Sequence, residues 1–340
     1  MKNTVLVTGG SGYIGSWVVK GLLEKGYTVR MTVRDKSKKE KYEFLTDIAD
    51  KNKGELEIWE ADLLKKGGFD EAAVGCDSIL HLASPFILNV KDAQLDLVDP
   101  AVKGTSNVLE AANKSNSVRK VILTSSVAAI YGDAIDMKNQ HLSKFTENEF
   151  NTSSSLDHQP YSFSKVQAEK KAWEIAKQQS SWELIVVNPS FVMGPSLESI
   201  SKSESIKFMR NILSGKFKSG AAELYFGYVD VRDVASAHIY CLENKAEGRH
   251  ILAERVTDIL SFSNLIEAEY KDKYKLPKSN NPKWVLSLIG SFFGLSRKFV
   301  KNNVGIPIQF DTSKSIEKLH LTYTPLQQTV RDMVDQMESQ

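Results

Sequence analysis

Little in this sequence points to a secreted, metal-binding or membrane-spanning protein. Its 340 residues include only two cysteines, Cys76 and Cys241, which indicate neither a disulfide framework nor a metal cluster, so we expect buried free thiols and no metal. The N-terminus reaches its glycines after too short an apolar run for a signal peptide, and the longest apolar stretch, 284–295, is too short to span a bilayer. That stretch is either a helix on a membrane surface or, as we favour, a helix packed over a pocket. We therefore expect a soluble, cytoplasmic protein without a membrane span.

The chain also lacks an excess of either charge. Lys plus Arg number 44 and Asp plus Glu 42, which leaves a formal net charge of +2. This balance does not give the electrostatic footprint of a nucleic-acid-binding protein. The hydrophobic fraction of 41% and the charged fraction of 25% are ordinary for a globular protein of one large domain or two interleaved ones.

Short β-branched runs alternate with longer amphipathic stretches through the first half of the chain. The expected buried strands lie at 4–9, 28–34, 56–62, 78–84, 120–126 and 183–189, and the clearest helical patterns at 14–26 and 101–115. This alternation predicts right-handed crossovers and an α/β fold with a doubly wound parallel sheet, the Rossmann arrangement.

The pattern changes after residue 190. Ser and Gly are frequent at 194–222, alternation returns at 224–255, and the remainder mixes helix and loop. We interpret this as a dinucleotide-binding core, residues 1–190 and about 224–258, interrupted by a smaller, discontinuous substrate lobe, about 191–223 and 259–340.

Three glycines follow the first predicted strand. Gly9, Gly12 and Gly15 form a G-x-x-G-x-x-G array where the strand turns into a helix. Glycine permits a tight turn and a close approach of the backbone to a pyrophosphate, whose charge then meets the N-terminus of the helix. Because the flanking strand and helix supply the required context, we predict a dinucleotide site rather than a purely structural turn.

The residue at the end of the second predicted strand bears on which dinucleotide is bound. An acidic side chain there ordinarily holds the adenosine ribose of NAD, whereas this chain has Arg34, followed by a cluster of lysines that includes Lys41. Such a cluster complements a 2'-phosphate through charge-assisted hydrogen bonds. Asp35 leaves a ribose contact open, and a solvated basic loop is the other alternative. We favour NADPH, with Arg34 as the main discriminating residue.

A tyrosine and a lysine lie four residues apart in "YSFSK", at Tyr161 and Lys165. In a helix this spacing places them on one face, where an ammonium would lower the pKa of the phenol and make it a usable proton donor. Ser125 and Ser126 end the predicted strand at 120–126, at the carboxyl edge where open α/β sheets bind ligands. Together they suggest a triad in which a serine orients a carbonyl and Tyr161 protonates its oxygen.

Taken together, the motifs resemble those of an extended short-chain dehydrogenase/reductase. The resemblance rests on the glycine array, "HLASP" at 81–85, "TSS" at 124–126, "YSFSK", "NPSFVMGP" at 188–195, "YVDVRDVASAH" at 228–238 and "FDTSKSIEKL" at 310–319. More narrowly, they are similar to the group of dihydroflavonol reductases, cinnamoyl-CoA reductases and yeast-type methylglyoxal or aldehyde reductases.

The resemblance implies roles for individual residues. It assigns catalysis to Ser126, Tyr161 and Lys165, with Ser126 preferred to Ser125. The residues that it assigns to the cofactor are Gly9, Gly12, Tyr13, Ile14, Gly15, Arg34, Lys41, Asp62, Leu63, Leu82, Ala83, Ser84, Thr124, Tyr161, Lys165, Pro189 and Val192. It also implies that Asp230, Arg232 and Asp233 tie the second lobe to the core, and we expect His81 to be a buried histidine bonded to backbone.

Two departures from the family pattern narrow the function. Sugar epimerases carry an Asn that supports a proton relay where this chain has Pro100 and Ala101, and "HQPYSFSK" replaces the signature of cinnamoyl-CoA reductases. We therefore expect an NADPH-dependent reductase of aldehydes or ketones, acting as a monomer or homodimer. Its substrate would be a small apolar or aromatic carbonyl compound, or one like a dihydroflavonol, with pocket residues Phe86, Ile87, Ile130, Tyr131, Phe191, Phe208 and Tyr225.

Three other functions stay open. A 3β-hydroxysteroid-type dehydrogenase or a nucleotide-sugar epimerase would use the same scaffold, although Arg34 disfavours their usual NAD. A non-catalytic, NADPH-sensing binding protein belongs to a different class, and such proteins typically lose the Tyr or Lys that this chain retains.

Overall fold

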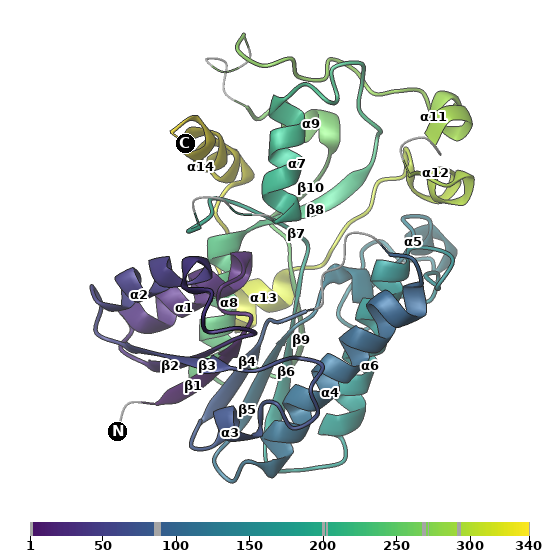
Figure 1. Ribbon diagram of the computed structural model, residues 1–340. Helices are drawn as coiled ribbons and strands as arrows, with labels where there is room; N and C mark the ends of the chain where they lie inside the picture. Colours follow the sequence, from purple (N-terminus) through teal and green to yellow (C-terminus); the bar gives the residue numbers. More distant parts are fainter. Residues whose placement is uncertain are drawn as a thin grey trace.

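The computed structural model describes residues 3–84, 90–198, 201, 203–266, 270, 272–290 and 294–339. Seven strands form its main sheet, in the order β3-β2-β1-β4-β5-β6-β9 (Figure 1). They are β1 (Thr4–Thr8), β2 (Thr28–Val33), β3 (Glu55–Glu60), β4 (Ser78–His81), β5 (Lys120–Thr124), β6 (Glu183–Pro189) and β9 (Gly248–Leu252). Every neighbouring pair is parallel, so the six predicted strands and the parallel sheet are confirmed.

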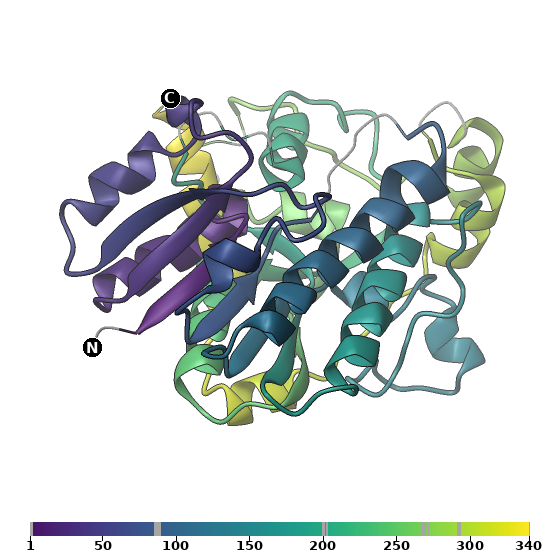
Figure 2. The same ribbon diagram turned by 60° about the horizontal axis from the view of Figure 1, so that its bottom comes forward.

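Helices cover both faces of this sheet (Figures 1 and 2). One face packs against α1 (Tyr13–Glu24), α2 (Glu43–Ala49) and α8 (Val231–Glu243), and the other against α3 (Asp70–Ala73), α4 (Asp99–Lys114) and α6 (Pro160–Ala176). In β1, Val5 and Val7 enter the first core while Leu6 enters the second. Strands buried on both faces read as continuous apolar runs, which explains why the sequence predicted them.

A second sheet of three strands, in the order β10-β8-β7, lies beyond the carboxyl edge of the first. It consists of β7 (Phe191–Met193), β8 (Tyr225–Asp230) and β10 (Arg255–Asp258). The helices α7 (Glu204–Leu213), α9 (Ile259–Ser263) and α14 (Leu326–Glu338) bury their apolar faces against it. The hairpin of α11 (Lys283–Ile289) and α12 (Arg297–Asn303) lies at the far end of this lobe (Figure 1).

Shorter elements complete the described chain. These are the 3-10 turns η1 (Lys39–Lys41) and η3 (Val127–Ala129), the π-helical turn η2 (Gln94–Val98), and the helices α5 (Asp136–Asn139) and α13 (Ser313–Lys318). In the segment 224–258 that we assigned to the core, β9 joins the main sheet and α8 packs on its face. The strands β8 and β10 of the same segment belong to the second sheet. The division into a core and a lobe with the predicted boundaries stays a proposal.

The start of α8 is bonded to the C-terminal segment of the chain. The hydroxyl of Thr329 donates to Asp230 at 2.8 Å, and the backbone N–H of Thr324 donates to Asp233 at 2.7 Å. Arg232 pairs with Asp230 at 2.8 Å. Asp230 at the end of β8 and Asp233 in α8 are thus bonded to residues 324–329, as the role predicted for this motif requires.

Two further features bear on the first expectations. Cys76 and Cys241 are buried and free, as expected. Among the described helices, none has the length and apolar character that crossing a bilayer requires.

Candidate active site

The glycine turn lies at the crevice between β1 and β4, where the strand order of the sheet reverses. Gly9 has a φ of +70°, and a side chain there would place its Cβ 2.7 Å from the backbone nitrogen of Ala83. A Cβ on Gly15 would lie 2.1 Å from the carbonyl oxygen of Gly9. Both positions therefore require glycine, and the crevice at a strand-order reversal is where open α/β sheets bind dinucleotides.

The N-terminus of α1 opens directly from this turn. Gly12 is exposed and caps the helix, and its carbonyl accepts the first intrahelical bond, from Ser16 at 2.8 Å. The amides of Tyr13, Ile14 and Gly15 precede that bond, so the helix itself gives them no acceptor. These amides and the helix dipole fit a pyrophosphate. The Tyr13 hydroxyl donates to the Gly194 carbonyl at 2.5 Å, and burial raises the pKa of this phenol well above its usual value.

Arg34 and Lys41 lie in the loop after β2, and both side chains are exposed. Asp35, the alternative ribose ligand, accepts hydrogen bonds from the backbone N–H of Ser37 at 2.9 Å and from its hydroxyl at 2.6 Å. These bonds and Lys38 hold the pKa of Asp35 at about 2. The loop therefore presents basic side chains outward, while its one carboxylate at this strand end is engaged locally.

Asp62 and Leu63 follow β3 at the same edge of the sheet. Asp62 accepts a hydrogen bond from the Leu64 N–H at 2.8 Å, so it closes its own turn. The Leu63 carbonyl accepts from the Asn107 side chain at 2.9 Å, and Gly104 on α4 leaves room for the Leu63 side chain. Leu63 is thus held next to the middle of α4.

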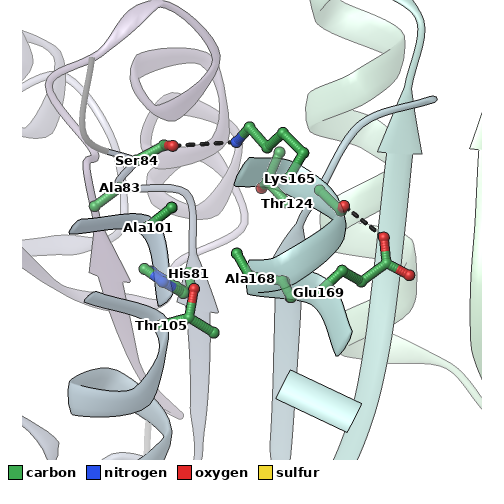
Figure 3. Close-up of a pocket in the computed structure, with 11 residues that line it drawn as sticks. His81, Ala83, Ser84, Ala101, Thr105, Thr124, Lys165, Ala168 and Glu169 are labelled. Atoms are coloured by element: carbon green, nitrogen blue, oxygen red, sulfur yellow. Dashed lines mark hydrogen bonds between the residues drawn. The ribbon is translucent and has the colours of Figure 1, made fainter. Parts of the chain in front are cut away.

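The residues after β4 connect the cofactor crevice to helix α6. The Thr8 hydroxyl accepts from the Ala83 N–H at 3.2 Å, which holds the segment Leu82–Ser84 against β1. Lys165 donates to the Ser84 hydroxyl at 3.1 Å, as Figure 3 shows. Its ammonium also lies 5.8 Å from the centre of the Tyr161 ring. The structure therefore brings Tyr161, Lys165 and Ser84 together at one site.

Tyr161 stands in the first turn of α6, and the predicted helix at "YSFSK" is confirmed. Its side chain is 46% exposed, unusually high for a large aromatic residue in a chain whose aromatic residues are mostly buried or half-buried. An exposed phenol beside a lysine, above a dinucleotide crevice, can contact a small molecule and donate a proton to it.

The two serines after β5 differ in their surroundings. Ser125 is buried, and its hydroxyl donates to Glu169 at 2.5 Å. Ser126 is half-buried, and its hydroxyl accepts a short-range bond from the Ala128 N–H, at 3.1 Å, that caps η3. Ser126 can therefore turn its hydroxyl to a ligand more readily than Ser125.

Glu169 is a site residue that sequence reasoning missed. Its side chain is fully buried, and it pairs with Arg249 at 2.6 Å and accepts from the Asn188 side chain at 2.8 Å. Asn188 also donates to the Ser126 carbonyl at 3.2 Å, so the network holds the serine turn. The only sequence signal is the spacing: Glu169 lies four residues after Lys165, on the same face of α6.

Other predicted residues support the same edge. The neutral His238 ring donates from Nδ1 to the Val234 carbonyl and therefore accepts from the Thr124 hydroxyl at Nε2, both at 2.7 Å. Pro189 ends β6, and Val192 in β7 packs into the core shared with α1. His81 is buried as expected, but its Nδ1 bonds the Thr8 hydroxyl at 2.7 Å rather than the backbone we expected, because β1 and β4 are adjacent.

A cavity of about 20 Å³, enough for roughly one water molecule, lies at this edge of the sheet and is lined in part by His81 and Thr124 (Figure 3). Its lining includes Ser84, Ala101, Lys165 and Glu169. The small Ala101 thus lines the same cavity as the lysine.

The residues predicted to line the substrate pocket lie in different surroundings. Ile130 is buried and packs in the apolar core around Phe145 and Phe310, and Tyr131 stacks on Phe145 with ring centres 4.9 Å apart. Phe191 packs against Phe208, with ring centres 5.1 Å apart. The Tyr225 hydroxyl donates to Glu223. Phe86 and Ile87 lie outside the described residues.

Comparison with known proteins agrees with this geometry. The sequence matches the NAD dependent epimerase/dehydratase family over residues 5–253. Cinnamoyl-CoA reductase CAD2 from Medicago truncatula is 35% identical, over 99% of this chain and 96% of the relative.

Solved structures of similar proteins include two NADPH complexes. Gre2 from Candida albicans in complex with NADPH is 33% identical and superposes with a TM-score of 0.81, over 99% of both chains. The yeast methylglyoxal/isovaleraldehyde reductase Gre2 complexed with NADPH is 26% identical, with a TM-score of 0.78 over 99% of this chain and 98% of that one. The chain belongs to the NAD dependent epimerase/dehydratase family and is an oxidoreductase of the extended short-chain type.

Proposed function

We propose that this family member is an NADPH-dependent reductase that converts aldehydes or ketones to alcohols. The observation that carries the proposal is the junction of Tyr161, Lys165 and Ser84, where a half-exposed phenol and a lysine meet the rim of the dinucleotide crevice. We further propose that the protein is cytoplasmic and acts as a monomer or homodimer.

The bound cofactor supplies a hydride to the carbonyl carbon. Tyr161 donates its hydroxyl proton to the carbonyl oxygen, and the resulting phenolate is stabilised by the nearby Lys165 ammonium. Lys165, held at Ser84, is placed to bind the nicotinamide ribose. The Ser126 hydroxyl donates to the same carbonyl oxygen and orients it. The other predicted cofactor residues, from Gly9 to Val192, form the dinucleotide crevice around this centre.

Three observations support NADPH over NADH. Arg34 and Lys41 are exposed at the strand end that meets the adenosine ribose, and Asp35 is engaged by Ser37. Two similar proteins were crystallised with NADPH. Cations in this place favour the extra phosphate through charge-assisted hydrogen bonds.

The substrate we propose is an apolar or aromatic carbonyl compound, or one like a dihydroflavonol. Aromatic side chains around Phe191 and Phe208 form an apolar cluster in the second lobe, which begins at β7 just after β6. A relative is a cinnamoyl-CoA reductase, but the chain lacks that group's signature before Lys165, so we expect no turnover of cinnamoyl-CoA.

The alternatives are less well supported. An epimerase would need a relay group where Ala101 lines the cavity, and a steroid dehydrogenase would ordinarily use NAD. A non-catalytic NADPH sensor has no need of Tyr161 and Lys165, which are both present and adjacent.

The test is oxidation of NADPH against NADH over a panel of carbonyl compounds. The panel holds methylglyoxal, isovaleraldehyde, an aromatic ketone, a diketone, a dihydroflavonol and cinnamoyl-CoA. Turnover of one class with NADPH would support the reductase, whereas a change in NADPH fluorescence on binding without oxidation of NADPH by any compound would favour the sensor. Faster turnover with NADH would contradict the role given to Arg34.

Replacing the proton donor tests the mechanism itself. We expect Tyr161→Phe to lower turnover by about 10²- to 10⁴-fold, the usual contribution of a general acid, with little change in NADPH affinity. The matched control is Tyr27→Phe, which removes a hydroxyl bonded to Glu243 away from the site. Near wild-type turnover by Tyr161→Phe on every accepted carbonyl would contradict the mechanism.

A further inference from the structure

A second buried carboxylate lies near the start of α6, before Tyr161 and away from Glu169 in the middle of the helix. Asp133 is 1% exposed, in the loop between η3 and α5. Four side chains donate to it, which we call the Asp133 hub: His158 at 2.8 Å, Gln159 at 2.8 Å, Asn302 at 2.8 Å and Asn303 at 2.7 Å.

The hub joins segments that are far apart in the sequence. His158 and Gln159 immediately precede α6, whereas Asn302 and Asn303 form the last turn of α12 in the second lobe. The connection continues through the backbone: the Ile135 N–H donates to the Asn302 carbonyl at 3.1 Å, and the Ala134 N–H donates to the Asn303 side chain at 2.9 Å. The lobe is thereby bonded to the first residues of the catalytic helix.

Gln159 shows how the hub controls the helix start. It has a φ of +54° and a ψ of +56°, the left-handed conformation that side chains other than glycine rarely adopt. Its side chain donates to the Gly132 carbonyl at 2.7 Å as well as to Asp133. Its own carbonyl accepts from the Phe163 N–H at 3.1 Å. The hub thus holds an unfavourable backbone conformation that sets where α6 begins.

Tyr161 stands two residues after Gln159, in a first turn whose N–H groups lack intrahelical acceptors. Its half-exposed side chain is not held by a surrounding core. The position of its hydroxyl therefore depends on what fixes the helix start.

We propose that the Asp133 hub positions Tyr161 for proton transfer, and that it does so by bonding the helix start to α12 of the second lobe. This inference rests on the proposed function. Asp133, His158, Gln159, Asn302 and Asn303 are positioning residues in it, since none of them needs to contact substrate. A movement of α12 would shift Asp133 through its bonds to Asn302 and Asn303. Asp133 would in turn shift His158 and Gln159, and with them the phenol.

Two variants test the hub from opposite sides. Asn302→Ala removes a donor that lies in the lobe, and Gln159→Gly removes the side chain while tolerating the positive φ. The matched control is Lys298→Ala, at an exposed position of the same helix α12. On a carbonyl that the wild type reduces, we expect both variants to lower kcat by about 10- to 100-fold, as a small displacement of a reacting group does. The NADPH Kd should stay within about twofold of the wild type.

The solvent deuterium isotope effect on kcat separates positioning from a loss of folded protein. It should rise in both variants, because proton transfer becomes slower than the other steps. A fall in kcat that matches the loss of folded enzyme, with an unchanged isotope effect, would overturn the inference.

Amide hydrogen exchange gives a readout that does not depend on turnover. Exchange over residues 159–165 should quicken in Asn302→Ala and not in Lys298→Ala. Unchanged exchange there would overturn the inference even if the enzyme is active. If the wild type reduces no carbonyl, the proposed function fails, while the exchange result still decides whether the lobe holds the start of α6.

Discussion

The middle and the start of the catalytic helix are held by buried carboxylates of different kinds. Glu169, one turn after Lys165, is paired with the cation of Arg249 and bonded to residues at the ends of β5 and β6. Asp133, before Tyr161, accepts mostly from neutral amides in loops and in α12. The lysine end of the Tyr161–Lys165 segment is therefore anchored to the parallel sheet, and the tyrosine end to the second lobe.

This difference separates two requirements of the site. In the proposed mechanism the lysine keeps a fixed place beside the cofactor, and the ion pair between α6 and β9 supplies this. In the same mechanism the tyrosine meets a carbonyl held by the lobe, which its anchor on the lobe would serve. Neutralising Glu169 leaves a second buried charge, on Arg249, without compensation, whereas neutralising Asp133 leaves mostly neutral amides behind.

Removing the charge at the sheet end should have the largest effect on stability. Glu169→Gln leaves the guanidinium of Arg249 buried without its carboxylate, and we expect a loss of about 3–5 kcal/mol in the free energy of unfolding. Urea denaturation measures it. Glu174→Gln, whose side chain is 56% exposed on the same helix, is the control and should change stability by less than about 1 kcal/mol. Equal losses in Glu169→Gln and Glu174→Gln would contradict a special contribution of the buried ion pair to stability.

The equivalent change at the lobe end should cost less. Asp133→Asn puts an amide N–H against groups that donate, and we expect a loss of about 1–3 kcal/mol in the free energy of unfolding. Asp157→Asn, exposed in the loop before α6, serves as the control. A larger loss at Asp133 than at Glu169 would reverse the comparison and make the lobe contact the stronger anchor.

A fall in pH should lower the free energy of unfolding through buried histidines near the main sheet. Burial lowers the pKa of His238 to about 4, so below the unfolded value of about 6.5 the unfolded chain binds a proton that the folded chain does not. Stability that is present above pH 6.5 is therefore lost as the pH falls towards 4, by about 1.4 kcal/mol per pH unit at most for one histidine. Burial also lowers the pKa of His250 to about 4, which adds loss in the same direction.

The carboxyls of Asp233 and Glu254 oppose this trend, because burial raises the pKa of each. Burial raises the pKa of Asp233 to about 6, so the folded chain binds a proton before the unfolded chain does as the pH falls from 6 to about 4. To isolate the histidine, His238→Gln is compared with the wild type by urea denaturation at several pH values. The variant should lose about 1 kcal/mol less per pH unit between pH 6 and 5. Parallel curves would show that His238 does not titrate with folding.

Much of the site could be predicted because its signals are local. Gly9 and Gly15 are required by contacts within the first turn and with the neighbouring strand, and Tyr161 and Lys165 share a face through helical spacing alone. The strands were found because burial on both faces leaves an apolar run in each. The role of Arg34 was inferred from its place at the end of the second strand, whereas the preference for Ser126 and the roles of most other cofactor residues came from the resemblance; all of these roles stay proposals.

The sequence by itself determined the parallel sheet, the dinucleotide turn and the tyrosine–lysine pair, because strand burial, glycine geometry and helix periodicity act over a few residues. Only the tertiary structure decided that Glu169 meets Arg249, that Asp133 gathers donors from α12, and that β8 and β10 form their own sheet with β7. Each of these pairs residues far apart in the chain. No local preference specifies such a partner, because it is the packing of whole elements that brings the groups within hydrogen-bonding distance.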